Sequence, residues 1–372
     1  MILWLLSFFK NYDFFNDLYR FFSYSTVRAV FSFSTAFFIS LLMGPLFIQW
    51  LKEKKYGQKI KYMKSKEALN FKELHGKKEG TPTMGGILIY LATILPIFLF
   101  IKPNIRIILI FFVMTSSFIL GLIDDLVKMK IKPGWGINSK IKLLSQIIIA
   151  TIVFLSIFFI LSKTKMDNYV IIPFLKNRYI YITSYILYFL WITFVIVGST
   201  NAVNLTDGLD GLAIGISIIV EAGLLILAYI MGRTDWSSYL YLPYIKGSNE
   251  IFVFLSALLG SCIGFLWYNC HPAQVFMGDS GALMLGGTFG TIAVLLHIEL
   301  FFAIFSIIFV VETLSVILQV SSYKFRKKRI FKMAPIHHHF EKSGWHENKI
   351  VIRFWIITFL FTILGIGILK LR

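Results

Sequence analysis

Asn201-Ala-Val-Asn-Leu-Thr-Asp-Gly-Leu-Asp-Gly211 separates two long apolar runs, Ile180 to Val197 and Leu212 to Met231. The stretch carries two carboxylates and two amides, and its two glycines permit tight backbone turns. It contains no basic residue, although the whole chain is strongly basic. Taken alone, its oxygen-bearing side chains indicate a loop that binds a metal ion. Apolar runs of this length are typical of membrane helices, so the stretch predicts a polar turn between two spans.

The composition of the 372 residues indicates the same class of protein. Hydrophobic residues make up 57% of the chain and charged residues only 15%, and the mean hydropathy is +0.75. A water-soluble domain cannot bury so large an apolar share, so we expect an all-α polytopic integral membrane protein. The formal net charge of +18 then lies in the loops and ends, where it serves topology, lipid headgroups or anionic substrates. Two cysteines are too few for a disulfide framework.

We predict about ten transmembrane helices within a single domain, residues 1–372. The apolar runs lie at about 27–50, 84–101, 105–123, 143–162, 180–199, 211–231, 251–268, 282–297, 299–321 and 350–369. An even number of spans places both termini on one side of the membrane. Residues 1–22 are apolar only over a short stretch and lack a basic start, so we interpret them as an interfacial segment.

The basic residues predict which side of the bundle faces the cytoplasm. The loops between spans 1–2, 3–4 and 9–10 hold 23 Lys and Arg residues, whereas the opposite face holds 13. The positive-inside rule makes the first face cytoplasmic and both termini external.

All motif-like polar stretches fall on that cytoplasmic face. They come from five loops and comprise Gly80-Thr-Pro-Thr-Met-Gly-Gly86, Asp124-Asp125, Asn201–Gly211, Asn269 with Phe276-Met-Gly-Asp-Ser-Gly281, and Pro335-Ile-His-His-His339. The outer loops contain nothing comparable. Loops with only a structural role would not sort their carboxylates and histidines onto one side, so we infer one cytoplasmic active site.

The carboxylates of these loops suit a magnesium site. Asp124 and Asp125 follow an apolar run, where their charges oppose the helix dipole and repel each other, so a cation partner is expected. Asp279 lies between glycines, with backbone N–H groups nearby that can receive phosphate oxygens. Mg²⁺ bound by such carboxylates and by substrate phosphates fits both motifs. The alternatives are a solvated pair at a helix end for Asp124-Asp125 and a plain turn for Asp279.

The remaining motifs each leave more than one interpretation. His337-His338-His339 could bind zinc, lie in solvent or contact phosphate, and we favour phosphate because neighbouring histidines rarely converge on one ion. The glycines of 80–86 form no P-loop and could instead allow close helix packing. The pairs Gly260/Gly264 and Gly286/Gly290 have the spacing of helix contacts. Glu221 and Glu312 lie inside apolar runs, and we leave both out of the site because structural pairing explains each equally well.

Together these motifs resemble one family. The chain closely resembles the bacterial phospho-N-acetylmuramoyl-pentapeptide transferases (the MraY family), within the polyprenyl-phosphate N-acetylhexosamine-1-phosphate transferase superfamily. The resemblance covers nearly the whole chain and is carried by Lys78–Gly86, Asp124-Asp125, Asn204–Gly211, Phe276–Gly281 and Met333–Glu341 with Gly344-Trp345.

The resemblance implies a reaction and its setting. UDP-MurNAc-pentapeptide and undecaprenyl phosphate would give lipid I and UMP with Mg²⁺ as cofactor, the first membrane step of peptidoglycan synthesis. It also implies ten spans in the bacterial inner membrane, both termini in the periplasm, a homodimer, contact with membrane lipids and no nucleic-acid partner. The lipid phosphate would attack directly as a dianion, since its second pKa is about 6. Attack by an aspartate to give a covalent phospho-enzyme is the rival scheme.

The resemblance also implies roles for single residues. Asp279 matches the magnesium-binding aspartate, and Asp124 and Asp125 match an aspartate pair that completes the metal site or acts as base. His338 joins these three as a catalytic candidate. The expected substrate-binding residues are Lys78, Thr83, Lys142, Asn204, Asp207, Leu209, Asp210, Asn269, Phe276, His337 and His339. Asn204 to Gly211 is thus better interpreted as the wall that recognises the nucleoside than as a magnesium loop.

Two other functions remain as alternatives at this point. A related enzyme would transfer GlcNAc-1-phosphate or another hexosamine phosphate from UDP to the same lipid, but the unbroken triple histidine favours the muramoyl-pentapeptide branch. A transporter of an anionic lipid-linked substrate would carry ionisable residues near mid-membrane and broken helices in matching halves, neither of which is obvious here.

Overall fold

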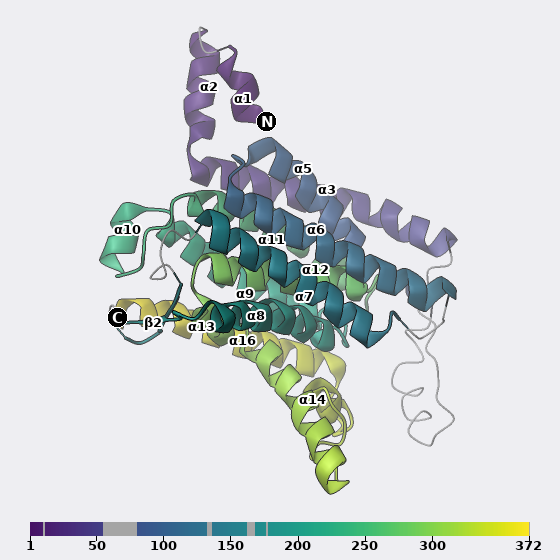
Figure 1. Cartoon of the computed structure of the whole chain (residues 1–372). Coiled ribbons are helices and arrows are strands. Elements are labelled where there is room, and N and C mark those ends of the chain that lie inside the picture. The colour runs from purple at the N-terminus through teal and green to yellow at the C-terminus, as the bar shows by residue number, and fades with distance from the viewer. Residues whose placement is uncertain (10–11, 55–79, 132–135, 162–167, 176–177, 372) are drawn as a thin grey trace.

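The computed structural model describes residues 1–9, 12–54, 80–131, 136–161, 168–175 and 178–371, and it is a bundle of long helices (Figure 1). Eight helices of this described part are long and apolar enough to cross a membrane. They are α3 (Ser25–Glu53), α6 (Ile105–Leu126), α7 (Ser139–Ser156), α8 (Tyr185–Thr206), α9 (Leu212–Met231), α11 (Ser248–Asn269), α14 (Ile307–Arg326) and α16 (Glu347–Leu371). The polytopic all-α class is therefore confirmed.

The other two predicted spans contain helices of a different character. The shorter α5 (Gly86–Phe100) fills the second span, and the glycine-rich α12 (Gly278–Leu295) fills the eighth. Single-turn π-helices, η2 (Val127–Ile131) and η3 (Ile157–Leu161), extend α6 and α7. All ten predicted runs thus overlap a helix.

Two predicted boundaries are wrong. The ninth run is not continuous, because α13 (Glu299–Phe305) ends before Ser306 and α14 begins after it, at Ile307. The Ser306 hydroxyl donates to the Phe302 carbonyl at 2.6 Å, a back-bond of the kind that bends helices. The fifth helix begins at Tyr185 and not at 180, since Tyr179–Tyr181 forms strand β2 and Ser184 caps α8 by accepting from the Leu187 N–H.

The centre of the bundle is α12, whose side chains are all buried from Ser280 to Leu295. It packs against α5, α6, α8 and α9. Gly286 and Gly290 of α12 lie against Ser199 of α8, and Gly260 and Gly264 of α11 lie against the backbone of α3. Side chains at these four positions would collide with the neighbouring helix, so the predicted small-residue contacts are confirmed.

One end of the bundle carries the short elements. The hairpin of β1 (Tyr169–Ile171) and β2, helix α10 (Thr234–Tyr239) and the C-terminus lie together there, far from the free end of α14 (Figure 1). Arg28 joins three helices at this end, since its guanidinium donates to Glu250 at 2.6 and 2.7 Å and to the Phe100 carbonyl. We call this the hairpin end.

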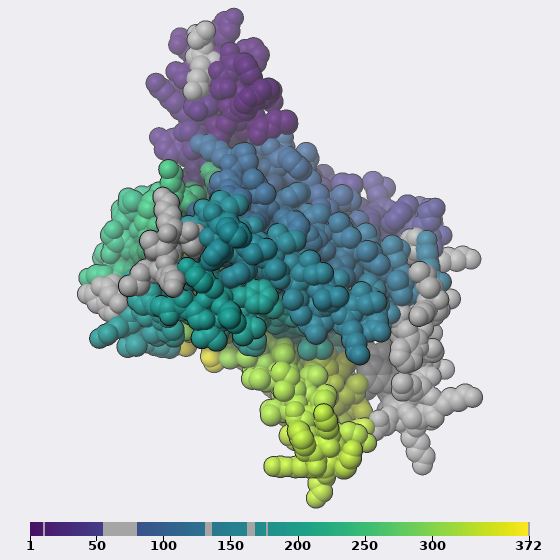
Figure 2. Space-filling model, in the orientation of Figure 1, coloured from purple at the N-terminus to yellow at the C-terminus, as the bar shows by residue number. Residues whose placement is uncertain are grey.

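The N-terminal residues form α1 (Ile2–Ser7) and α2 (Asp13–Ser23), which protrude from the bundle in the space-filling view (Figure 2). The Met1 amine donates to the Phe98 carbonyl at 2.9 Å, which ties α1 to the hairpin end of α5. Trp4, Phe8 and Phe14 are exposed. Short helices with an exposed apolar face can lie at a membrane interface, and the interfacial role of this segment stays a prediction.

Candidate functional site

The predicted motifs meet at the end of the bundle opposite the hairpin end. Asp124 and Asp125 lie in the last turn of α6 and are buried. Because the helix continues into η2, the side chain of Lys128 lies one turn beyond Asp124 on the same face. Asp279 lies in the first turn of α12, where the helix dipole favours a carboxylate.

Two lysines join Asp124 to Asp279. The Lys128 ammonium lies 2.8 Å from Asp124 Oδ2 and 2.8 Å from Asp279 Oδ1. The Lys142 ammonium lies 2.6 Å from Asp279 Oδ2 and 3.4 Å from Asp124 Oδ2. The Ile137 N–H also donates to Asp124 Oδ1. Two carboxylates and two ammonium groups therefore form one balanced cluster, which we call the lysine–aspartate cluster.

Asp125 has a different setting from its neighbour. Its Oδ1 accepts from the Asp279 N–H at 3.0 Å and its Oδ2 accepts from the Ser280 N–H at 2.9 Å. Asp125 thus caps the N-terminus of α12 and fixes the backbone that carries Asp279. Gly278 has a φ of 75°, and a side chain there would collide with Asp125 and Thr83.

The glycines of the 80–86 stretch bring a second segment against this turn. The Phe276 N–H donates to the Pro82 carbonyl at 2.8 Å, and the Gly85 and Gly86 N–H groups donate to Phe276 and Met277 at 2.9 Å. Gly86 lies so close to the Gly281 backbone that a side chain would not fit. The close-packing interpretation of these glycines is therefore confirmed, and Thr83 lies half-buried beside Gly278.

The loop between α8 and α9 lies next to the cluster. Asp207, the residue after α8, lies close enough to Asp279 and Asp125 for their negative charges to act on its carboxyl group. Burial, followed by these two carboxylates, raises the pKa of Asp207 to about 7. Asn204 is half-buried in the last turn of α8, whereas Leu209 is 4% exposed and belongs to the apolar core.

Asp210 belongs to a separate group that joins three loops. Its Oδ2 lies 3.2 Å from His271 Nδ1 and accepts from the Ala273 N–H at 3.1 Å, while its own N–H donates to Glu347 at 2.6 Å. Buried Asn269 completes the connection, because it accepts from the Gly211 N–H and donates to the Val275 carbonyl. The ligand atoms of Asp210, His271 and Glu347 lie within 4.8 Å of one another, so they could also hold a metal ion.

The three histidines have separate partners. His337 is buried with its Nδ1 3.1 Å from Glu312 Oε1, and its Nε2 faces Gly208. His338 Nδ1 lies 2.6 Å from Glu341, and His339 Nδ1 accepts from the Lys332 N–H at 3.1 Å. Helix α15 (Ile336–Glu341) thus places its first histidine against the loop between α8 and α9 and does not direct the three rings toward one ion.

The structure brings together six of the fifteen site residues that we predict, and it adds four. Asp124, Asp125, Asp279, Lys142 and Thr83 meet, with Asp207 beside them; Lys78 lies outside the described residues. We did not include Lys128, His271, Glu312 and Glu347. Lys128 follows Asp124 by four residues, a spacing that places both on one face of a helix and so predicts their contact. Nothing in the sequence pairs His271 with Glu347 or His337 with Glu312.

The chain matches known protein families over most of its length. Residues 107–297 match the model of glycosyl transferase family 4, and residues 78–89 match signature 1 of the phospho-N-acetylmuramoyl-pentapeptide-transferases. A phospho-N-acetylmuramoyl-pentapeptide-transferase of Koribacter versatilis (strain Ellin345) is 42% identical over 368 residues, which is 95% of both chains. Those of Borrelia hermsii (strain HS1 / DAH) and Borrelia turicatae (strain 91E135) are 42% and 43% identical over 95% of this chain and 98% of theirs.

Proposed function

The chain belongs to the phospho-N-acetylmuramoyl-pentapeptide transferase family, and from this premise we propose how its described residues carry out the transfer. The enzyme moves phospho-MurNAc-pentapeptide from UDP to undecaprenyl phosphate, and the products are lipid I and UMP. The observation that carries our proposal for the site is the lysine–aspartate cluster, in which Lys128 and Lys142 join Asp124 to Asp279.

Mg²⁺ is the cofactor in this proposal. The donor set fits, because Asp124 and Asp279 offer carboxylate oxygens, the ligands that Mg²⁺ prefers. A bound Mg²⁺ would offset the negative charge that develops on the phosphate oxygens. Asp125 acts as a positioning residue, since both of its oxygens accept backbone N–H groups of α12. The Asp210 group is less suited to Mg²⁺, because one of its donors is an imidazole nitrogen.

The chain's own cations and loops position the two substrates. Lys128 and Lys142 would exchange their carboxylate contacts for phosphate oxygens, as ammonium groups do in phosphoryl transfer. Thr83, which lies beside Gly278, would contact the pyrophosphate or sugar, and so would His338 and His339. Asn204, Asp207, Leu209 and Phe276 would line the nucleoside pocket, which Asp210, Asn269 and His337 hold in shape.

The attack follows from the substrate's own chemistry. The lipid phosphate is largely a dianion near neutral pH, since its second pKa is about 6. Its oxygen bonds to the sugar-bearing phosphorus of the UDP substrate while the bond to the UMP oxygen breaks. Direct attack therefore needs no strong base, and we prefer it to a phospho-aspartate intermediate.

The protein acts in the bacterial inner membrane as a multi-pass protein in this proposal. The face with the lysine–aspartate cluster is cytoplasmic, and both termini lie in the periplasm. The basic loops support this orientation. We further propose that residues 1–372 act as one domain and assemble as a homodimer among membrane lipids.

One assay tests the proposed substrate. Purified full-length protein receives undecaprenyl phosphate, Mg²⁺ and either UDP-MurNAc-pentapeptide or UDP-GlcNAc, and UMP release is measured. We expect release only with the first nucleotide sugar. Release only with UDP-GlcNAc would contradict the proposal and establish the hexosamine-phosphate alternative.

A further inference from the structure

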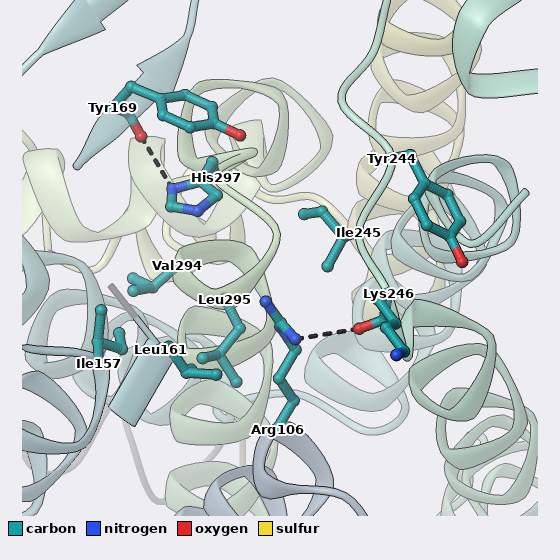
Figure 3. Close-up of a pocket in the computed structure, with 10 residues that line it drawn as sticks. All are labelled: Arg106, Ile157, Leu161, Tyr169, Tyr244, Ile245, Lys246, Val294, Leu295 and His297. Carbon is teal, nitrogen blue, oxygen red and sulfur yellow. Dashed lines mark hydrogen bonds between the residues drawn. The ribbon is translucent and has the colours of Figure 1, made fainter. Parts of the chain in front are cut away.

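A hollow in the described part of the molecule lies at the hairpin end (Figure 3). It is a cavity of about 270 Å³, and its walls come from the four connections at this end. The lining residues are Arg106, Ile157, Leu161, Tyr169, Tyr244, Ile245, Lys246, Val294, Leu295 and His297. The transfer reaction as described above uses none of them.

The charged part of the lining is cationic. Arg106 and Lys246 are lining residues, and none of the ten carries a carboxylate. The Arg106 side chain points upward between Leu295 and Lys246, and its Nη1 donates to the Lys246 carbonyl at 3.0 Å (Figure 3). Its Nε is buried and has no hydrogen-bond partner within the described residues. A guanidinium held in this way has N–H groups left for an anion.

The nearest carboxylate in sequence does not neutralise this charge. Glu299 follows His297 by two residues, but it is buried in α13 and accepts from Trp191 Nε1 at 3.2 Å. Glu250, in α11, is held by Arg28 on both of its oxygens. Asp235 of α10 pairs with Arg233 at 2.6 Å, and among the described residues no carboxylate forms an ion pair with Arg106 or Lys246, so the lining stays cationic.

The wall opposite Arg106 is rigid. The rings of Tyr169 and His297 stack with their centroids 4.3 Å apart. His297 Nδ1 lies 3.0 Å from the Tyr169 carbonyl, and the Ile171 N–H donates to the His297 carbonyl at 3.1 Å. Strand β1 is therefore fixed to the end of α12, so the cavity exists before a ligand enters, which favours binding.

The floor of the cavity is apolar and continues onto the lipid-facing surface. Ile157 and Leu161 of η3 lie in the floor, while Phe159 and Ile160 of the same turn are 74% and 58% exposed. On a membrane-spanning helix, exposed apolar side chains contact the acyl chains of the lipids. A ligand with a phosphate and an acyl tail could place the first against Arg106 and Lys246 and the second along η3.

We propose that this cavity binds the phosphate of an anionic lipid headgroup at the hairpin end of the bundle. The phosphate contacts Arg106 and Lys246, and the acyl chains follow Ile157 and Leu161 into the bilayer. The same phosphate chemistry would also accept a free anion, and the experiment separates the two sources.

Photo-crosslinking tests the site on the full-length protein in lipid nanodiscs. The probe is phosphatidylglycerol with a photoactivatable acyl chain, and crosslinks are mapped by peptide mass spectrometry. We expect crosslinks in residues 157–161 and 294–297, and about a tenfold lower yield there in Arg106→Gln or Lys246→Gln, the loss typical of one charged hydrogen bond. The basic segment 324–329 at the other end serves as an internal control, because its yield should not change.

Matched variants on the same face exclude a general charge effect. Arg178→Gln and Lys102→Gln remove exposed cations outside the cavity and should leave the yield unchanged. If Arg106→Gln fails to fold because the bond to the Lys246 carbonyl is lost, Lys246→Gln decides, since its side chain is exposed.

The ligand source follows from two further arms. If inorganic phosphate lowers the crosslink yield of the lipid probe, the phosphate group alone suffices for binding. If it does not, binding requires the acyl tail as well. Both outcomes support phosphate recognition at Arg106 and Lys246. Equal crosslinking by zwitterionic phosphatidylcholine, or an unchanged yield in both cavity variants, would overturn the proposal.

Discussion

Lys128 and Lys142 make it possible for Asp124 and Asp279 to lie close together. Asp124 is buried and Asp279 is half-buried, and two carboxylates that share the same ammonium groups repel each other strongly, because charges are poorly screened away from water. Each ammonium contacts both carboxylates at 2.6 to 3.4 Å, so the repulsion is offset without a metal. In the proposed reaction, the substrate phosphates and Mg²⁺ would replace part of these contacts.

The first prediction concerns Lys128. Lys128→Gln removes one of the two bridging charges, so we expect kcat for lipid I formation to fall roughly a hundredfold, as with loss of one transition-state donor. UMP release at saturating substrate measures this. Lys130→Gln is the matched control, since Lys130 is exposed two residues further along and should keep wild-type activity within twofold, as surface positions usually do. If kcat falls equally in both variants, Lys128 contributes only to the general positive charge of this region and not through its contacts with Asp124 and Asp279.

The second prediction uses the raised pKa of Asp207. Burial and the neighbouring Asp279 and Asp125 raise it to about 7, so the folded chain binds this proton more tightly than the unfolded chain. Stability must then fall as pH rises from about 4 to 7. Asp207→Asn cannot lose the proton, and we expect its Tm to fall less than that of the wild type between pH 5 and 8. Thermal unfolding in EDTA measures the difference.

Asp235 provides the control for that titration. Its contact with Arg233 lowers its pKa to about 2, so its stabilising contribution is complete above pH 4 and is lost only in stronger acid. Asp235→Asn should leave the slope of Tm between pH 5 and 8 unchanged. An unchanged slope in Asp207→Asn as well would show that Asp207 does not titrate in this range.

At the scale of helices, the site depends on how closely α5 approaches α12. Gly86 begins α5, and its Cα faces the backbone of Gly281, two residues after Asp279. Nothing but glycine fits there, because the neighbouring atoms are backbone and cannot move aside. The distance between these helix ends therefore sets the position of the turn that carries Asp279, although neither glycine has a functional group.

The third prediction follows from that contact. Gly86→Ala forces α5 away from α12, so we expect destabilisation of about 1–3 kcal/mol and a lower kcat, because Asp279 shifts from the lysines. Gly367→Ala is the matched helical control, since no atom lies within 4 Å of its added methyl group and alanine favours helix. Thermal unfolding and UMP release are measured for both. Full activity in Gly86→Ala would contradict this role of the contact.

For the whole molecule, the sequence predicts the architecture well because the bilayer restricts it. A membrane span needs about 20 apolar residues and cannot leave backbone groups unpaired, so hydropathy alone finds the helices. The same argument fails at Ser306 and at Tyr179–Tyr181. There a local hydrogen bond and a strand pairing decide the structure, and neither changes the hydropathy of the segment.

The sequence predicts part of the membership of the candidate site but not its pairings. Orientation by basic loops places the aspartates and histidines on one face, yet it cannot say that Asp125 caps α12 while Asp124 binds lysine. Adjacent residues on a helix point about 100° apart, so each enters a different environment. Likewise, Glu312 pairs with His337 only because α14 passes beside α15, a contact between segments that the sequence does not relate.

The last prediction separates the two carboxylate groups at the end of the bundle opposite the hairpin end. If Mg²⁺ binds between Asp124 and Asp279, Asp279→Asn should abolish magnesium-dependent turnover, and added Mg²⁺ should not restore it. Asp210→Asn is the comparison, because Asp210 joins three loops through His271 and the Glu347 carboxylate. Its loss should raise KM for the UDP substrate while the Mg²⁺ concentration at half-maximal rate stays near the wild-type value. Magnesium titrations of UMP release measure both quantities, and a shifted magnesium requirement in Asp210→Asn alone would move the metal from Asp279 to the Asp210 group.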